Sequence, residues 1–329
     1  MKKFINQVEL VEDQMIQGMV KAYPQYVRKL DCGNVVVRTE KKEGKVALIS
    51  GGGSGHEPAH GGYVGTGMLD AAVAGAVFTS PTPDQIYEGI KAIATDKGVL
   101  MVIKNYTGDV MNFEMAGEMA QMDEIKVAQV VVNDDVAVDG SLYTVGRRGV
   151  AGTVFVHKIA GAKAEEGAEL EEVQRVAQKV IDNVRTMGVA IRPCTVPAAG
   201  KPGFELGEDE MEVGIGIHGE PGTHKEPLRP ADEIVDHILD KILADIDYTG
   251  REVAVMVNSS GATPLMELFI INNHVADVLA AKGIKVYKTF VGEYMTSLEM
   301  EGFSVSLLRL DDELKALLDA HADTIAFKA

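Results

Sequence analysis

The sequence predicts an α/β protein of two domains, each with a mainly parallel or mixed sheet flanked by helices, and a substrate site between them. Its 329 residues are about twice the length of a typical domain. Short Val- and Ile-rich runs alternate with segments of helical periodicity, which is typical of βαβ units. The pattern restarts after a Pro- and Gly-rich passage at 192–203. We therefore expect an N-terminal domain at 1–188 and a C-terminal domain at 189–329.

In the N-terminal half, a helix start is indicated at Thr82-Pro83, where a Thr cap precedes a proline in the first helical position. The expected elements are a helix at 8–22, strands at 35–37 and 46–49, a helix from 83 to about 98, a strand at 99–103, a helix to about 122, a strand at 127–132, and helices at 149–163 and 169–187. Ligands of parallel sheets bind beyond the carboxyl ends of the strands. The loops at 50–62, 104–109 and 133–148 are therefore expected to converge.

The C-terminal half is expected to repeat the alternation of strands and helices. Its elements are a strand at 211–217, a loop at 218–222, a helix at 231–246, a strand at 253–257, a long helix after Pro264, strands near 285–291 and 303–309, and a short C-terminal helix.

Charge and composition exclude several classes of protein. The net charge of −17 disfavours nucleic acid and anionic membranes as partners. No apolar run approaches the ~18–20 residues of a membrane span, and the N-terminus turns polar too soon for a signal peptide. Two cysteines, Cys32 and Cys194, are too few for a disulfide framework or a four-cysteine zinc site. We expect a cytoplasmic protein.

The stretch at 50–62 contains six glycines and follows an apolar run, so its backbone can approach a small polar ligand closely. The candidate ligands are a phosphate, a metal and a small oxygenated substrate. The alternative is a tight turn that binds no ligand. The Lys-Ser/Thr that completes a P-loop is missing. His56 to His60 match the H-E-x-x-H pattern of zinc proteases, but Pro58 disfavours the helix that this pattern needs.

Three ionisable residues follow predicted strands elsewhere. Lys104 and Asp109 flank one strand end, and His218 follows another among glycines. Asp109 alone could be a helix cap and Lys104 a surface charge, but beside His56 they suit a site that deprotonates a hydroxyl and holds it. The remaining histidines are expected to be structural: His60, His157, His224, His237, His274 and His321.

Long motifs along essentially the whole chain resemble the dihydroxyacetone-binding subunits of bacterial dihydroxyacetone kinases. They lie at 46–58, 78–84, 104–109, 143–151, 194–202, 216–222 and 261–265. The resemblance implies that His218 attacks the ketone of dihydroxyacetone and forms a hemiaminal. It also implies that Gly53, Ser54, Gly55, His56, Lys104 and Asp109 surround the triose, with His56 and Asp109 activating the hydroxyl that receives the phosphoryl group.

The resemblance also implies partners. ATP-dependent relatives continue into a nucleotide-binding domain, whereas this chain ends at Ala329, so we expect the separate subunit of the phosphotransferase-system-dependent, phosphoenolpyruvate-driven enzyme. ADP and magnesium are then expected on a partner subunit, which a phosphocarrier subunit recharges, and no metal or cofactor is expected on this chain. Family members are homodimers. The alternative is a non-catalytic paralogue that binds dihydroxyacetone as a transcriptional coactivator; the joint presence of His56, Lys104 and Asp109 favours the enzyme.

Overall fold

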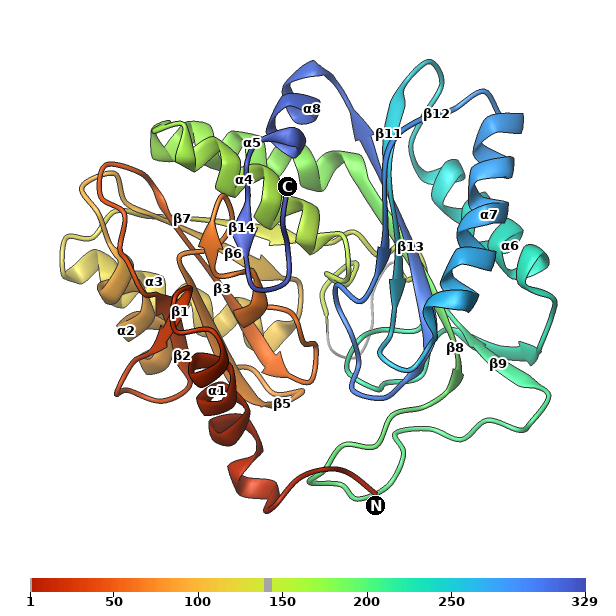
Figure 1. Cartoon of the computed structure of the whole chain (residues 1–329), viewed down its shortest axis with the longest axis horizontal. Coiled ribbons are helices and arrows are strands. Elements are labelled where there is room, and N and C mark those ends of the chain that lie inside the picture. The colour runs from red at the N-terminus through yellow and green to blue at the C-terminus, as the bar shows by residue number, and fades with distance from the viewer. Residues whose placement is uncertain (1, 139–143) are drawn as a thin grey trace.

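The computed structural model describes residues 2–138 and 144–329, which form two α/β halves side by side (Figure 1). Tyr143, the first residue of the motif at 143–151, lies outside the described residues. The two-domain α/β prediction is confirmed. Each half is built on a six-stranded sheet, and a two-stranded pair of β4 (Gly65–Thr66) and β14 (Asp323–Thr324) ties the C-terminus to the first half.

The first sheet has a parallel centre, as its Val-rich runs predict. β3 pairs in parallel with β5 and β6, and β6 with β7, while β1 and β2 add an antiparallel edge. Its strands in spatial order are β1 (Val27–Lys29), β2 (Val35–Arg38), β5 (Ala71–Val77), β3 (Ala47–Ser54), β6 (Val99–Lys104) and β7 (Val127–Val132). The helices of this half are α1 (Val11–Ala22), α2 (Pro83–Ile93), α3 (Thr107–Met122), α4 (Thr153–Glu165) and α5 (Leu170–Asn183), with short 3-10 turns η1 (Val8–Leu10) and η2 (Gly61–Tyr63).

The second sheet is mixed, because only β11 and β12 pair in parallel. Its strands in spatial order are β10 (His224–Pro227), β9 (Glu210–Val213), β8 (Val184–Arg192), β13 (Glu301–Leu310), β11 (Glu252–Ser259) and β12 (Lys285–Gly292). Its helices are α6 (Ala231–Asp245), α7 (Leu265–Ala281) and α8 (Asp312–Asp319).

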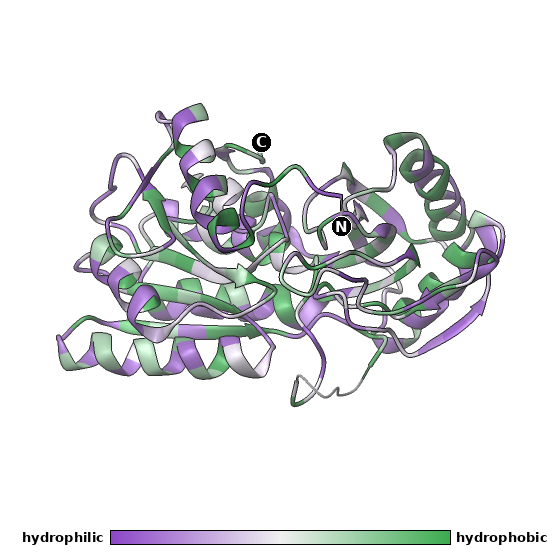
Figure 2. Ribbon diagram, turned by 90° about the horizontal axis from the view of Figure 1, so that it is seen from below, coloured by the Kyte–Doolittle hydropathy of each residue, from purple (hydrophilic) through white to green (hydrophobic). Residues whose placement is uncertain are grey.

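The helices form layers around the two sheets. α2 and α3 cover the outer side of the first sheet, α6 and α7 cover the outer side of the second, and α4, α5 and α8 lie between the two (Figure 1). One buried apolar cluster joins Leu48 and Val102 of the first sheet to Met256 and Leu308 of the second. Figure 2 shows hydrophilic and hydrophobic residues alternating along helices of the molecule. The shared central layer holds the two halves in a fixed relation, which a site between them requires.

Three predicted elements differ from the structure. The helix predicted at 169–187 ends at Asn183, and residues from Val184 onward form β8. The backbone of β8 pairs with β13, and its Val and Met side chains are buried. The predicted domain junction at 188 therefore falls inside a strand of the second sheet. The strand predicted at 211–217 ends at Val213, since Gly214 turns the chain with φ of +71°.

The glycine stretch is also more regular than predicted. Ser50 to Ser54 continue β3 instead of forming a loop, and only the residues from Gly55 onward turn. A Cβ at Gly53 would lie 2.5 Å from the backbone nitrogen of Thr79, so a larger residue does not fit there. Within the described residues, no helix is both long and apolar enough to cross a membrane.

Candidate functional site

A cleft of about 510 Å³ opens where the two halves meet. The first half contributes Phe78, which follows β5, and Tyr106, which follows β6. The second half contributes the loop of His218 and Gly219. The loop after β7 joins the same edge, because the side-chain amide of Asn105 donates to the carbonyl of Arg147 at 2.7 Å. The predicted convergence of loops at the strand ends is confirmed.

His56 and His218 meet at the back of this cleft. The Nε2 atoms of the two rings are 3.2 Å apart, and Nδ1 of His56 lies 2.9 Å from the carbonyl oxygen of Thr296. Because Nδ1 of His56 donates to that carbonyl, its neutral ring carries a lone pair on Nε2, and His218 donates to it. The turn before His56 is fixed from the second half, since Leu298 donates its backbone N–H to Gly55 at 2.7 Å.

Both imidazoles are held in the neutral form. Burial, with the nearby charge of Lys104, lowers the pKa of His56 to about 3. Burial, with His56 and Lys104, lowers the pKa of His218 well below its usual range. A neutral histidine is the form that can act as a nucleophile or a base.

Two aromatic rings enclose the histidine pair. Phe78 stacks on His56 with ring centroids 5.3 Å apart, and Tyr106 packs edge-on against His218 at 4.2 Å. A Cβ at Gly55 would lie 2.8 Å from the Phe78 ring, so glycine permits this stacking. The rings restrict the rotamers of both histidines and limit the access of water to them.

Lys104 and Asp109 form a buried ion pair beside the cleft. Lys104 is 0% exposed, and its Nζ donates to the Gly51 carbonyl at 2.9 Å and lies 3.5 Å from Oδ2 of Asp109. A Cβ at Gly52 would lie 2.4 Å from that Nζ, so glycine makes room for the ammonium group. Burial lowers the pKa of Lys104, and Asp109 opposes that shift. The interpretation of Lys104 as a surface charge is wrong.

The interpretation of Asp109 as a helix cap is also wrong. Tyr106 is the N-cap of α3, and Asp109 lies in the first turn. Its Oδ1 accepts a hydrogen bond from Ser80, while its Oδ2, within the described residues, accepts none. A buried carboxylate oxygen without a hydrogen-bond donor can accept a proton or bind a hydroxyl group.

The loop that carries His218 is anchored by a buried arginine from the other half. Glu220 accepts a hydrogen bond from the backbone N–H of His218 at 2.8 Å, and Nη1 of Arg148 lies 3.5 Å from Glu220. Arg148 also donates to Asp135 and to the Gly214 carbonyl, both at 2.7 Å. A Cβ at Gly216 would overlap Glu220, so this anchor needs glycine. Sequence reasoning missed Arg148 and Glu220, although both lie inside the conspicuous motifs at 143–151 and 216–222.

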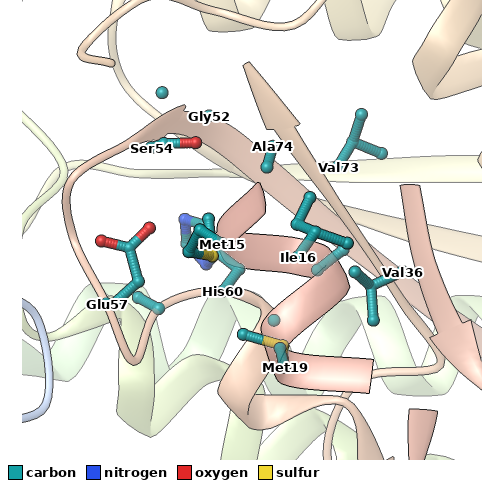
Figure 3. Close-up of a pocket in the computed structure, with 14 residues that line it drawn as sticks. Met15, Ile16, Met19, Val36, Gly52, Ser54, Glu57, His60, Val73 and Ala74 are labelled. Carbon is teal, nitrogen blue, oxygen red and sulfur yellow. The ribbon is translucent and has the colours of Figure 1, made fainter. Parts of the chain in front are cut away.

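Of the predicted site residues, His218 alone lines the cleft, and His56, Lys104 and Asp109 are buried beside it. Gly53 and Ser54 line a second, much smaller pocket on the α1 side of β3, shown in Figure 3. The Ser54 hydroxyl donates to the Gly75 carbonyl at 2.7 Å, and the Gly55 N–H donates to the Glu57 carboxylate at 3.1 Å. The structure therefore brings His56, Lys104, Asp109 and His218 together, and places Gly53 and Ser54 behind them.

The zinc-protease pattern does not form in this structure. Residues 57–60 make a turn, so His56 and His60 are not one helical turn apart on a shared face. Among the described residues, no group of three His, Cys, Asp or Glu side chains is arranged to hold a metal ion. His60 and His157, predicted as structural, are both buried, and His60 contacts Lys104 directly.

Comparisons with known proteins are consistent across sequence and structure. Residues 17–326 match the Dak1 domain family. The chain is 55% identical over 329 residues to the dihydroxyacetone-binding subunit DhaK of PTS-dependent dihydroxyacetone kinase 1 from Listeria innocua, covering 99% of this chain and 100% of that one. Among solved structures, the dihydroxyacetone kinase of C. freundii superposes with a TM-score of 0.93 at 36% identity, covering 99% of this chain and 60% of that chain. A dihydroxyacetone kinase operon co-activator, Dha-DhaQ, superposes with a TM-score of 0.89 at 37% identity, covering 95% and 97%.

Proposed function

Because the chain belongs to the Dak1 domain family, we propose that it is the dihydroxyacetone-binding subunit of a phosphotransferase-system-dependent dihydroxyacetone kinase. It holds dihydroxyacetone as a hemiaminal on His218 and presents it for phosphorylation to dihydroxyacetone phosphate. One observation carries the proposal: the ring of His218, kept neutral, lines a cleft 3.2 Å from His56, and both rings feel the charge of Lys104, which pairs with Asp109. The 55% identity to a subunit of that name supports the substrate and the reaction class.

Formation of the adduct uses the two histidines together. Nε2 of His218 attacks the ketone carbon, so one N–C bond forms and the π bond of the carbonyl breaks. The proton that His218 carries on Nε2 passes to the lone pair of His56 Nε2, 3.2 Å away. The resulting imidazolium then gives this proton to the alkoxide oxygen. His56 returns to its neutral form, and the adduct forms without net uptake or loss of protons.

Phosphorylation uses the ion pair. Oδ2 of Asp109, which accepts no hydrogen bond within the described residues, takes the proton of the triose hydroxyl as the hydroxyl oxygen attacks the phosphoryl group. A P–O bond to the triose forms, and the P–O bond to the phosphoryl donor breaks. The Lys104 ammonium, 3.5 Å from the same oxygen, donates to the triose and stabilises negative charge. The covalent bond to His218 fixes the orientation of the hydroxyl, which favours in-line attack.

The proposed phosphoryl donor is a nucleotide held with magnesium by a partner subunit. A third, phosphocarrier subunit recharges that nucleotide from phosphoenolpyruvate. These partners, and assembly of this chain as a homodimer, are part of the proposal.

The covalent bond also gives selectivity. Glycerol has nearly the same shape as dihydroxyacetone but no carbonyl, so it forms no adduct. A site that requires a particular group discriminates far more strongly than one that measures size.

A second candidate function is that of a triose-binding co-activator of transcription. The TM-score of 0.89 to a solved operon co-activator supports it. The chain is, however, more similar to a kinase subunit, at 55% against 37% identity, and it has His56, Lys104 and Asp109 buried beside the cleft. The kinase function is therefore the one we favour.

The test is reconstitution with the nucleotide-carrying and phosphocarrier subunits of the Listeria system. Dihydroxyacetone phosphate is measured with phosphoenolpyruvate as the donor, and then with ATP in its place. We expect phosphoenolpyruvate-dependent turnover with this chain and none with His218→Ala. A chain that binds dihydroxyacetone but supports no turnover, beside a Listeria subunit that does, would favour the co-activator function.

A further inference from the structure

Behind the cleft, three buried side chains form a row, and the proposed reaction uses only the first of them, Lys104. Lys104 Nζ lies 2.9 Å from Nε2 of His60, and Nδ1 of His60 lies 3.0 Å from Nε2 of His157. The exposed fractions are 0%, 6% and 0% for Lys104, His60 and His157. They come from three elements: the end of β6, the turn after β3, and α4. We call these residues the Lys104–His60–His157 row.

The chemistry of the groups fixes where the protons lie in this row. An ammonium group only donates, so Nε2 of His60 must accept from Lys104 and carries a lone pair. The ring proton of neutral His60 is therefore on Nδ1, from which it is donated to Nε2 of His157. The proton of His157 is then on its own Nδ1, which has no partner within the described residues. The hydroxyl of Ser50 already donates to the Val102 carbonyl, so toward His60 Nδ1, 3.4 Å away, it can only accept.

The surroundings of the row keep both imidazoles neutral. Figure 3 shows His60 beside a small pocket under α1, with Met15, Ile16 and Met19 over it. The pocket measures about 20 Å³, which is room for about one water molecule. Burial, with the charge of Lys104, lowers the pKa of His60 well below its usual range and that of His157 to about 3. Neutral rings are what the assigned order of protons requires.

We propose that His60 and His157 are positioning residues that aim the Lys104 ammonium at the bound triose. Lys104 has three N–H groups, of which the Gly51 carbonyl and His60 accept two. The third is left for an oxygen of the substrate, on the side of Asp109, whose Oδ2 lies 3.5 Å away. His157 acts one step further back, because its Nε2 accepts the Nδ1–H of His60 and so holds that ring with its Nε2 toward Lys104. This inference rests on the proposed function for the identity of the ligand, and neither histidine touches the substrate.

Two pairs of variants separate this role from simple packing. In His60→Gln the amide oxygen can reach the position of Nε2 and accept from Lys104, whereas the shorter His60→Asn reaches only the level of Nδ1. His157→Gln likewise keeps an acceptor for His60, whereas His157→Phe removes it. We expect His60→Asn and His157→Phe to weaken dihydroxyacetone binding by about 10- to 100-fold, the effect of losing one charge-assisted hydrogen bond. We expect both Gln variants to stay within about threefold of the wild type.

A spectroscopic readout needs no ligand. Nitrogen-15 NMR of the histidine rings in the free protein should show His60 as the neutral Nδ1–H tautomer. In His157→Phe the His60 ring loses its acceptor, so we expect it to turn away from Lys104 and to populate the Nε2–H tautomer as well. A His60 that is Nε2–H or doubly protonated in the wild type would overturn the proposal. A purely structural role of His157 predicts no change of tautomer at His60.

The matched control is Tyr63→Phe. The Tyr63 ring lies 6.2 Å from that of His157, and its hydroxyl donates to the Tyr294 carbonyl outside the row. We expect a lower melting temperature in this variant, with the His60 tautomer and triose binding as in the wild type.

The outcomes distinguish this inference from the proposed function. If the wild-type chain does not bind dihydroxyacetone, the proposed function fails. The tautomer of His60 in the free protein still tests the order of protons assigned to the Lys104–His60–His157 row. If the wild type binds dihydroxyacetone, and folded His60→Asn and His157→Phe bind it as tightly as the wild type does, then the positioning role of His60 and His157 is refuted. The proposed function stands in that case. If either of these variants does not fold, the Gln variants decide: loss of binding in folded His60→Gln would contradict the acceptor role.

Discussion

The molecule contains two close histidine pairs that differ in what surrounds them. His56–His218 and His60–His157 have nitrogen separations of 3.2 and 3.0 Å, and burial lowers the pKa values in both. His218 lines a cleft of about 510 Å³ on a glycine-flanked loop, whereas His157 lies within α4 among core side chains. The lowered pKa is common to both pairs and therefore does not distinguish them. What differs is access, because His218 lies between Gly216 and Gly219 and lines the cleft.

Removing the imidazole of His218, which lines the cleft, should have the largest effect on dihydroxyacetone binding. His218→Ala leaves no nucleophile, so we expect binding of dihydroxyacetone to weaken by more than about 100-fold, or about 2.7 kcal/mol. Isothermal titration of both proteins measures this. His274→Gln is the control, because His274 pairs with Asp236 far from the cleft. Equal affinity in His218→Ala would assign the covalent role to another group.

Changing Asp109 should separate binding from chemistry. Asp109→Asn keeps the shape and the contact with Ser80 but removes the base, so we expect the adduct to form while turnover falls by about 10²- to 10⁴-fold. Steady-state assays with the partner subunits, alongside the titration, give both quantities. Full turnover in Asp109→Asn would leave the carboxylate with a structural role only.

Acid should destabilise the fold through both pairs. His56 and His157 have pKa values of about 3 in the folded chain and ordinary values near 6.5 when unfolded. The unfolded chain therefore binds more protons below pH 6.5, so stability is complete above pH 6.5 and is lost as the pH falls toward 3. We expect a loss of about 1.4 kcal/mol per pH unit for each such histidine. Urea unfolding at pH 7, 6 and 5 measures the slope, and a flat profile would mean that these rings are already charged in the folded state.

The smallest expected effect is that of pH on the affinity for the triose. The pKa of His218 lies well below its usual range, so the ring stays neutral and binding should vary little between pH 8 and pH 6. An imidazole with an ordinary pKa of about 6.5 would lose about fourfold over this interval. Titrations at the two pH values, with circular dichroism to verify that the chain is folded at each, distinguish these outcomes.

The periodicity of the sequence predicts most of the framework and the main ionisable groups. The parallel centre of the first sheet, the cleft at its strand ends, and the meeting of His56, Lys104, Asp109 and His218 all followed from local patterns and resemblance. β8 was misassigned because Val184 to Met187 extend a helical pattern, and only pairing with β13 makes them a strand. Arg148 and the Lys104–His60–His157 row were missed because contacts between residues 44 to 97 positions apart leave no local signal.

The most direct test of the central claim is a carbon-13 NMR spectrum of dihydroxyacetone, labelled at its carbonyl carbon, bound to this chain. Our account predicts that the bound signal leaves the ketone region and appears where tetrahedral carbons with two heteroatoms resonate, and that it is absent in His218→Ala. Bound dihydroxyacetone that keeps its ketone signal in the wild-type chain would contradict the covalent attachment to His218.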